Sequence, residues 1–160
     1  MAKKVKIKKT LVEQILSKAA IPHQGIQINA LEGELPQGYE RDQIFKTLAL
    51  LGDKTGPIIG IVPITQHLSE KKLAKISGNK KVSMIPQKDL EKTTGYIHGA
   101  NNPVGIRQKH NYPIFIDKIA LDLDQMIVSA GEVRHSIIVA PQDLASFVKA
   151  DFVDILEDIK

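Results

Sequence analysis

The stretch "IFKTLALLGDKTGPIIGIVPI", residues 44–64, decides how we expect this chain to fold. Two runs rich in Ile, Leu and Val stand on either side of "DKTG", a short segment of turn-forming residues. This pattern predicts two strands joined in a hairpin. Because apolar side chains are so dense in both runs, we expect the hairpin to occupy a central position in the fold.

Helices and further strands are predicted on both sides of this hairpin. Thr10 and Glu13 have the spacing of a capping box at the start of a helix over 10–20. A second helix is expected over 68–80, with Ser69 as N-cap, Gly78 at its end, and Leu68, Leu73 and Ile76 facing inward. Further helices are predicted over 86–95 and 141–159, strands over 82–85, 112–117, 126–131 and 135–140, a short alternating segment over 26–30, and a loop from Thr93 to the strand at 112–117.

The bulk properties indicate one ordinary globular domain spanning 1–160, preceded by a basic N-terminal extension at 1–9. The chain has 160 residues, of which 42% are hydrophobic and 25% charged. No run approaches the roughly 18 apolar residues of a membrane span, and the basic start lacks the apolar segment of a secretory signal. We therefore expect a cytoplasmic protein with no membrane contact.

Composition also limits the chemistry. With no cysteine, the protein can supply no thiol nucleophile, thiolate ligand or disulfide. A net charge of +4 is compatible with a polyanion such as RNA, but few aromatic residues are present to stack on bases. A basic band is predicted from five lysines: Lys71, Lys72, Lys75, Lys80 and Lys81. This band is either a solvated face or a surface that steers a polyanion.

Lys46 is the first candidate for a functional residue. On the strand pattern it shares a face with Leu48 and Leu50, so its ammonium group enters or borders the interior. A buried cation needs an anionic partner or ligand. Two interpretations remain open: a lysine at the strand entrance whose head reaches water, or a cation that waits for a phosphate or an ester.

The loop "TTGYIHGANNPVG", residues 93–105, is the second candidate. Its three glycines and two asparagines allow unusual backbone conformations, which can turn N–H groups toward phosphate or a developing oxyanion. A plain surface turn is the alternative. His98 is the one histidine we single out, because no pair of histidines has metal-binding spacing and no metal is expected. Ser129 lacks the surroundings of a serine nucleophile, and completing a turn at a strand end is its simpler role.

Three motifs together resemble those of the YbaK family, also labelled EbsC, which is related to the editing domain of bacterial prolyl-tRNA synthetases. They are "QIFKTLAL" from Gln43, the loop from Thr93, and "IVSAG" from Ile127. The resemblance implies an α+β fold, a single compact domain with a mixed, barrel-like sheet surrounded by helices. It also implies a trans-editing deacylase that clears Cys-tRNA(Pro).

In the resemblance the family's essential positions map onto Lys46, Gly99 and Ser129. Lys46 would engage the phosphate or ribose at the acceptor end, Gly99 the ester carbonyl, and Ser129 the aminoacyl group. The rest of the substrate-binding set would be Thr94, Gly95, Tyr96, His98 and Pro103. The cysteine of the substrate would attack its own ester, without a cofactor, so that the protein contributes positioning.

The expected partners are the acceptor end of an aminoacylated tRNA and, through the resemblance, a docked prolyl-tRNA synthetase. Three alternatives remain open: a deacylase for Ala-tRNA(Pro) that uses water, a tRNA-binding module without turnover, and a regulator acting through protein contacts alone. A binding module would bind tRNA in a salt-dependent way without releasing the amino acid.

Overall fold

The computed structural model describes residues 9–158, and the predicted hairpin lies at its centre. Strand β2 (Phe45–Gly52) pairs antiparallel with β3 (Gly56–Pro63) along its whole length. Both faces of β3 are covered, because Ile59 packs into one hydrophobic cluster and Ile58 into another. The central position expected for the hairpin is therefore confirmed.

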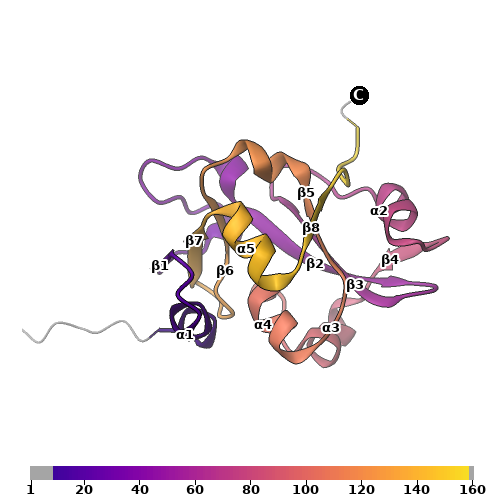
Figure 1. Cartoon of the computed structure of the whole chain (residues 1–160), viewed down its shortest axis with the longest axis horizontal. Coiled ribbons are helices and arrows are strands. Elements are labelled where there is room, and N and C mark those ends of the chain that lie inside the picture. The colour runs from indigo at the N-terminus through magenta and orange to yellow at the C-terminus, as the bar shows by residue number, and fades with distance from the viewer. Residues whose placement is uncertain (1–8, 159–160) are drawn as a thin grey trace, which may run out of the picture.

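Within residues 9–158 the strands form two sheets (Figure 1). A five-stranded sheet has the order β4-β2-β3-β5-β8, with antiparallel pairs around β2 and parallel pairs on both sides of β5. A three-stranded antiparallel sheet has the order β1-β7-β6. The remaining strands are β1 (His23–Ile26), β4 (Val82–Met84), β5 (Ile114–Asp117), β6 (Met126–Ser129), β7 (Ser136–Val139) and β8 (Asp151–Val153).

An isolated parallel bridge between Ile44 and Ile127 joins the two sheets. The prediction of one compact α+β domain with a mixed sheet is confirmed. Within residues 9–158 the sheets do not close into a barrel, so the barrel-like description is not confirmed. The basic extension predicted at 1–9 lies, apart from Lys9, outside the described residues.

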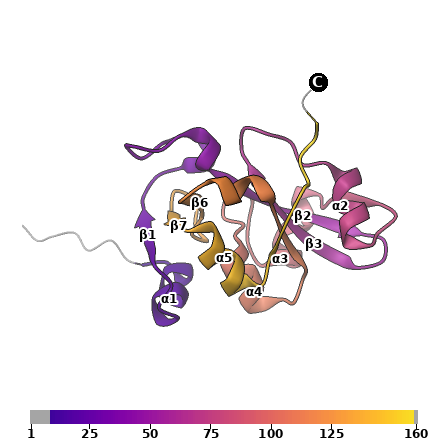
Figure 2. The ribbon, with the colours of Figure 1, turned by 45° about the horizontal axis from the view of Figure 1, so that its top comes forward.

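In the described part of the chain, five α-helices surround the sheets. Helices α1 and α2 lie at opposite ends of the molecule, beside the three-stranded sheet and beside β4 respectively (Figures 1 and 2). The bounds are α1 (Leu11–Lys18), α2 (Glu70–Ser77), α3 (Gln87–Thr94), α4 (Pro103–Lys109) and α5 (Pro141–Val148), with short 3₁₀ helices η1 (Ala30–Glu32), η2 (Arg41–Gln43) and η3 (Lys118–Asp122).

The predicted helix ends are confirmed where the signal is local. Thr10 and Glu13 form the capping box of α1. The Ser69 hydroxyl accepts the Lys72 N–H at the start of α2, and Gly78 ends that helix with a φ of +80°. Such caps depend only on neighbouring residues, so sequence predicts them well.

Among the residues that the structure describes, the core consists of three clusters on the sheet faces. The largest fills the space between the two sheets and helices α1, α4 and α5. A second lies under α2 and a third behind the three-stranded sheet. The clusters include, in that order, Phe45, Ile61, Ile116, Val128 and Leu144; Leu50, Val62 and Leu73; and Ile44, Ile127 and Ile138.

Helix α4 corrects the prediction of an unbroken loop after Thr93. Asn102 is its N-cap, with the side-chain Oδ1 accepting the Gly105 N–H at 2.6 Å, and Pro103 opens the first turn. Gly105 is required by packing, because a Cβ there would collide with the Tyr96 ring. Asn102 and Pro103 are thus a helix start signal, and Gly105 marks a close contact of that helix with Tyr96.

The prediction of a helix over 141–159 was wrong in its second half. Helix α5 ends at Val148, and Lys149 takes a left-handed conformation with a φ of +57°. The chain then pairs with β5 as strand β8, parallel and along the edge of the sheet. Ile76 was also wrongly placed inward, since 41% of it is exposed.

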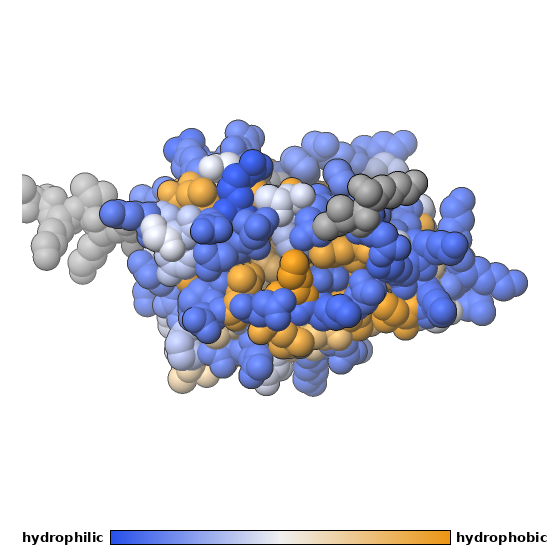
Figure 3. Space-filling view, turned by 90° about the horizontal axis from the view of Figure 1, so that it is seen from above, coloured by the Kyte–Doolittle hydropathy of each residue, from blue (hydrophilic) through white to orange (hydrophobic). Residues whose placement is uncertain are grey.

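Figure 3 shows one face on which hydrophilic residues surround smaller apolar patches near the middle. None of the described helices is long and apolar enough to cross a membrane.

Candidate active site

A pocket of about 550 Å³ lies beside the first half of β2. Strand β4 pairs only with Leu50–Gly52, so the edge of β2 before Leu50 is open to other partners. The Thr47 carbonyl accepts the Asn101 side-chain amide there, and the Ala49 carbonyl accepts the Ile85 N–H. The pocket is lined by Asn29, Glu32, Lys46, Thr47, Leu48, Ala49, Ile64, Met84, Ile85, Gln87, Leu90, His98, Gly99, Asn101 and Val133.

Lys46 is half-buried in the wall of this pocket. The four ion pairs found among residues 9–158 do not include it. Burial lowers the pKa of its ammonium group below 10.5, because desolvation disfavours the charged form. A cation without a carboxylate partner in a pocket is suited to an anionic or strongly polar ligand.

The Gly99 turn, defined as residues 97–100, forms another part of the wall. The Ala100 N–H donates to the Ile97 carbonyl at 3.0 Å, and Gly99 has a φ of +89°. A residue with a side chain is strained in this conformation. The turn places His98, which is exposed, in the pocket lining together with Gly99.

Three of the predicted site residues, Lys46, Gly99 and His98, therefore meet in one pocket. The other loop candidates do not line it. The Thr94 hydroxyl is buried and accepts the Tyr96 N–H, and Gly95 ends α3 with a φ of +88°.

Tyr96 and Pro103 likewise have contacts that shape the loop. The Lys109 ammonium lies 4.5 Å from the centre of the Tyr96 ring, and Pro103 is buried at the start of α4. These contacts hold the two ends of the loop, so that the Gly99 turn between them has a defined position.

Ser129 is buried at the end of β6 and is not part of the pocket lining. Its hydroxyl accepts the Gly131 N–H at 3.2 Å. This contact matches the simpler of the two roles considered for it, completion of a turn. Its role toward a substrate stays a prediction.

Thr47 and Asn101 are among the lining residues that the sequence interpretation missed. Both are almost fully buried, and the Asn101 side-chain amide donates to the Thr47 carbonyl at 3.1 Å. Thr47 follows Lys46 directly but belongs to the opposite face of the strand. Nothing in the local sequence signals this contact, because 54 positions separate the two residues.

The pocket thus combines an unpaired cation, backbone at a left-handed turn, and apolar walls. Within residues 9–158 no group of three or more His, Asp or Glu side chains is arranged to hold a metal ion. Such a site can bind a small group attached to a polyanion and position it for reaction.

Comparison with known proteins identifies the family. Residues 33–147 match the model of the aminoacyl-tRNA editing domain. A relative from Enterococcus faecalis named "Putative Cys-tRNA(Pro)/Cys-tRNA(Cys) deacylase EbsC" is 38% identical over 162 residues, which cover 97% of this chain and 98% of the relative.

Solved structures show the same fold. One described as a "putative trans-editing enzyme for prolyl tRNA synthetase" has a TM-score of 0.77 and 22% identity, and the match covers 92% of this chain and 95% of that one. A second, described as a hypothetical protein, has a TM-score of 0.81 and 20% identity, over 91% of this chain and 99% of its own. The family resemblance found from the three motifs is confirmed: this chain belongs to the aminoacyl-tRNA editing domain family.

Proposed function

We propose that this protein is a trans-editing deacylase that removes cysteine from mischarged Cys-tRNA(Pro). The observation that carries the proposal is the pocket in which the unpaired Lys46 and the Gly99 turn come together. Family membership and the name of the Enterococcus faecalis relative support the same activity and substrate class.

In the proposed reaction the substrate supplies its own nucleophile. The cysteine sulfur forms a bond to the ester carbonyl carbon, the ester C–O bond breaks, and the terminal tRNA hydroxyl leaves with the proton lost by the thiol. The products are a cyclic thiolactone and uncharged tRNA. Because the attack is intramolecular, holding the thiol near the carbonyl accounts for much of the acceleration.

The pocket residues have distinct roles in this proposal. Lys46 binds the phosphate or ribose of the terminal nucleotide, and its half-burial strengthens that attraction relative to an exposed lysine. Gly99 lets the backbone approach the ester carbonyl closely, since a side chain at this position is absent. His98 lies in the pocket lining and is exposed, where it can contact the nucleotide.

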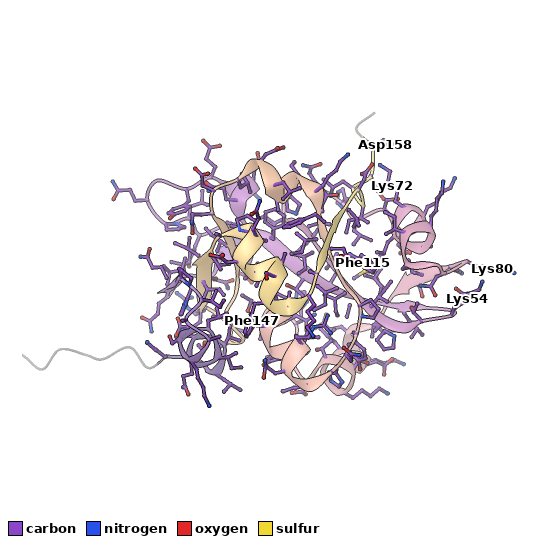
Figure 4. The ribbon with its side chains drawn as sticks, in the orientation of Figure 1. Lys54, Lys72, Lys80, Phe115, Phe147 and Asp158 are labelled. Atoms are coloured by element: carbon purple, nitrogen blue, oxygen red, sulfur yellow. The ribbon has the colours of Figure 1, made fainter. Side chains whose placement is uncertain are left out.

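The predicted binding partner is the acceptor end of the tRNA. Lys54 and Lys80 project from the same end of the molecule (Figure 4). The Asp53 carboxylate accepts the backbone N–H of Lys80 there, which joins the β2–β3 turn to the segment before β4. Such exposed lysines attract phosphates through long-range charge. Lys72 contributes less, because its ammonium is paired with Asp158 at 2.8 Å.

A prolyl-tRNA synthetase that presents the tRNA, and a cytoplasmic location where tRNA is charged, are further parts of this proposal. The first of them is supported by the similarity in fold to the solved protein described as a trans-editing enzyme for prolyl tRNA synthetase.

Two other functions make different predictions for the same pocket. A deacylase for Ala-tRNA(Pro) would use water as nucleophile, because alanine has no thiol. A binding module without turnover would bind tRNA in a salt-dependent way and release no amino acid.

The test is amino acid release from Cys-tRNA(Pro), from Ala-tRNA(Pro), and from Cys-tRNA(Pro) whose cysteine has been alkylated. The protein has no cysteine, so residual alkylating reagent has no protein thiol to attack. We expect rapid release from the cysteinyl ester only. Equal release from the alkylated ester would refute the thiol mechanism, and tRNA binding without release from any ester would refute the deacylase proposal.

A further inference from the structure

Two buried polar atoms in the pocket wall lack a hydrogen-bond partner. They are the Thr47 hydroxyl oxygen and the Asn101 side-chain oxygen, the two such side-chain atoms found in residues 9–158. Thr47 is 8% exposed and Asn101 7%, and both residues line the pocket. Buried polar groups are normally paired, so an unpaired couple at one site points to a ligand that completes it.

The contact between the two residues fixes which Asn101 atom is free. Its amide nitrogen lies 3.1 Å from the Thr47 carbonyl oxygen, which can only accept a hydrogen bond. The nitrogen must therefore face that carbonyl, and the free atom is the amide oxygen, an acceptor. The Thr47 hydroxyl can also accept, so two residues of the pocket lining each offer an unpaired acceptor.

The aminoacyl part of the substrate has one group that matches two acceptors. The ester oxygens are themselves acceptors, and a thiol is a weak donor. The α-amino group carries two or three N–H donors in every aminoacyl ester. Apolar neighbours in the same wall, Leu48 and Ala49, suit the short side chain of cysteine or alanine.

Charge placement is consistent with this match. Lys46 and Thr47 are consecutive strand residues, so their side chains leave β2 on opposite faces. A bound ammonium group beside Thr47 is thereby kept apart from the Lys46 cation, which is left for the nucleotide.

We propose that Thr47 and Asn101 form a subsite that accepts hydrogen bonds from the α-amino group of the aminoacyl ester. This inference rests on the proposed deacylase function and adds a specificity to it. The subsite selects esters with a free amino group over N-blocked esters such as N-acetylcysteinyl or peptidyl esters, whose acylated nitrogen has a single N–H.

The experiment measures release from Cys-tRNA(Pro) and from N-acetyl-Cys-tRNA(Pro) by the wild type, Thr47→Val and Asn101→Leu. Thr47→Val is the main variant, because it keeps the β-branched shape and removes only the unpartnered hydroxyl. Thr93→Val is the control, since the Thr93 hydroxyl bonds to the Asp89 carbonyl within α3, outside this pocket.

We expect Thr47→Val to lower kcat/KM for the free-amino ester on the order of tenfold, the usual effect of losing one hydrogen bond to a charged group. The rate with the N-acetyl ester should stay unchanged, so the ratio of the two substrates falls. Asn101→Leu should lower the ratio in the same direction, and Thr93→Val should leave it as in the wild type.

An equal loss of kcat/KM on both substrates in Thr47→Val, or no loss on either, would overturn the inference, because Thr47 and Asn101 would then not distinguish a free amino group from a blocked one. A wild type that releases amino acid from neither ester would instead refute the deacylase proposal, and the inference with it.

Discussion

Replacing Gly99 with alanine tests whether the pocket depends on one backbone conformation. Gly99 has a φ of +89°, and a Cβ added there would lie 3.5 Å from the nearest Val133 carbon, an ordinary contact. The penalty is therefore conformational, about 1–2 kcal/mol for an alanine held in the left-handed region. The unfolding free energy should fall by that amount, which corresponds to roughly 2–8 °C in Tm for a chain of this size.

Deacylation should fall much further than stability. The turn can relieve its strain only by moving the backbone on either side of position 99, and this shifts His98 and Asn101 in the pocket wall. A displacement of about 1 Å in a positioned site lowers rates on the order of 100-fold. Urea denaturation gives the stability change, and release from Cys-tRNA(Pro) gives the activity change.

Gly78→Ala is the matched control. Gly78 has a φ of +80° at the end of α2, a Cβ there would meet nothing within 4 Å, and it does not line the pocket. Both variants should lose similar stability, but only Gly99→Ala should lose activity. Similar activity in the two variants would refute the role given to the Gly99 turn.

Three further predictions concern stability. In the wild type, the unfolding free energy should rise with pH between the lowered pKa of Lys46 and 10.5, because in that range the unfolded chain still binds the proton that the folded protein has released. Lys46→Met should abolish this rise. Identical pH profiles of the two proteins in urea titration would contradict the prediction. Asn79→Ala should reduce the unfolding free energy by about 2 kcal/mol, since the Asn79 side-chain oxygen accepts both the Lys54 and Thr55 N–H groups. A loss below about 0.5 kcal/mol, typical of a neutral surface change, would mean that the stability of the β2–β3 turn does not depend on these hydrogen bonds. Thr47→Val should leave stability unchanged or raise it by up to about 1 kcal/mol, because the hydroxyl has no partner in the protein; a clear loss in thermal melts would show that the hydroxyl is satisfied without substrate.

The elements that could be predicted from sequence are those whose signals are local. The β2–β3 hairpin follows from two apolar runs around a turn, and the ends of α1 and α2 follow from Thr10, Ser69 and Gly78. Strand β8 was mistaken for a helix because its structure comes from pairing with β5, far away in the chain. Long-range pairing of this kind overrides local propensity.

In the candidate site, too, some residues could be predicted from local sequence and others depend on long-range contacts. Lys46 and Gly99 belong to sequence motifs, and a positive φ at a glycine is a local property. Thr47 and Asn101 become a pair only when the loop before α4 reaches the edge of β2. No pattern within either segment contains that contact, so it could be found only in the folded structure.

The most direct measurement is the single-turnover rate of cysteine release from Cys-tRNA(Pro) by the wild type and by Lys46→Met, whose side chain has a similar length and no charge. We predict fast release by the wild type, and release at the uncatalysed rate by a variant that stays folded. A folded Lys46→Met variant that releases cysteine as fast as the wild type would contradict the assignment of this pocket as the active site.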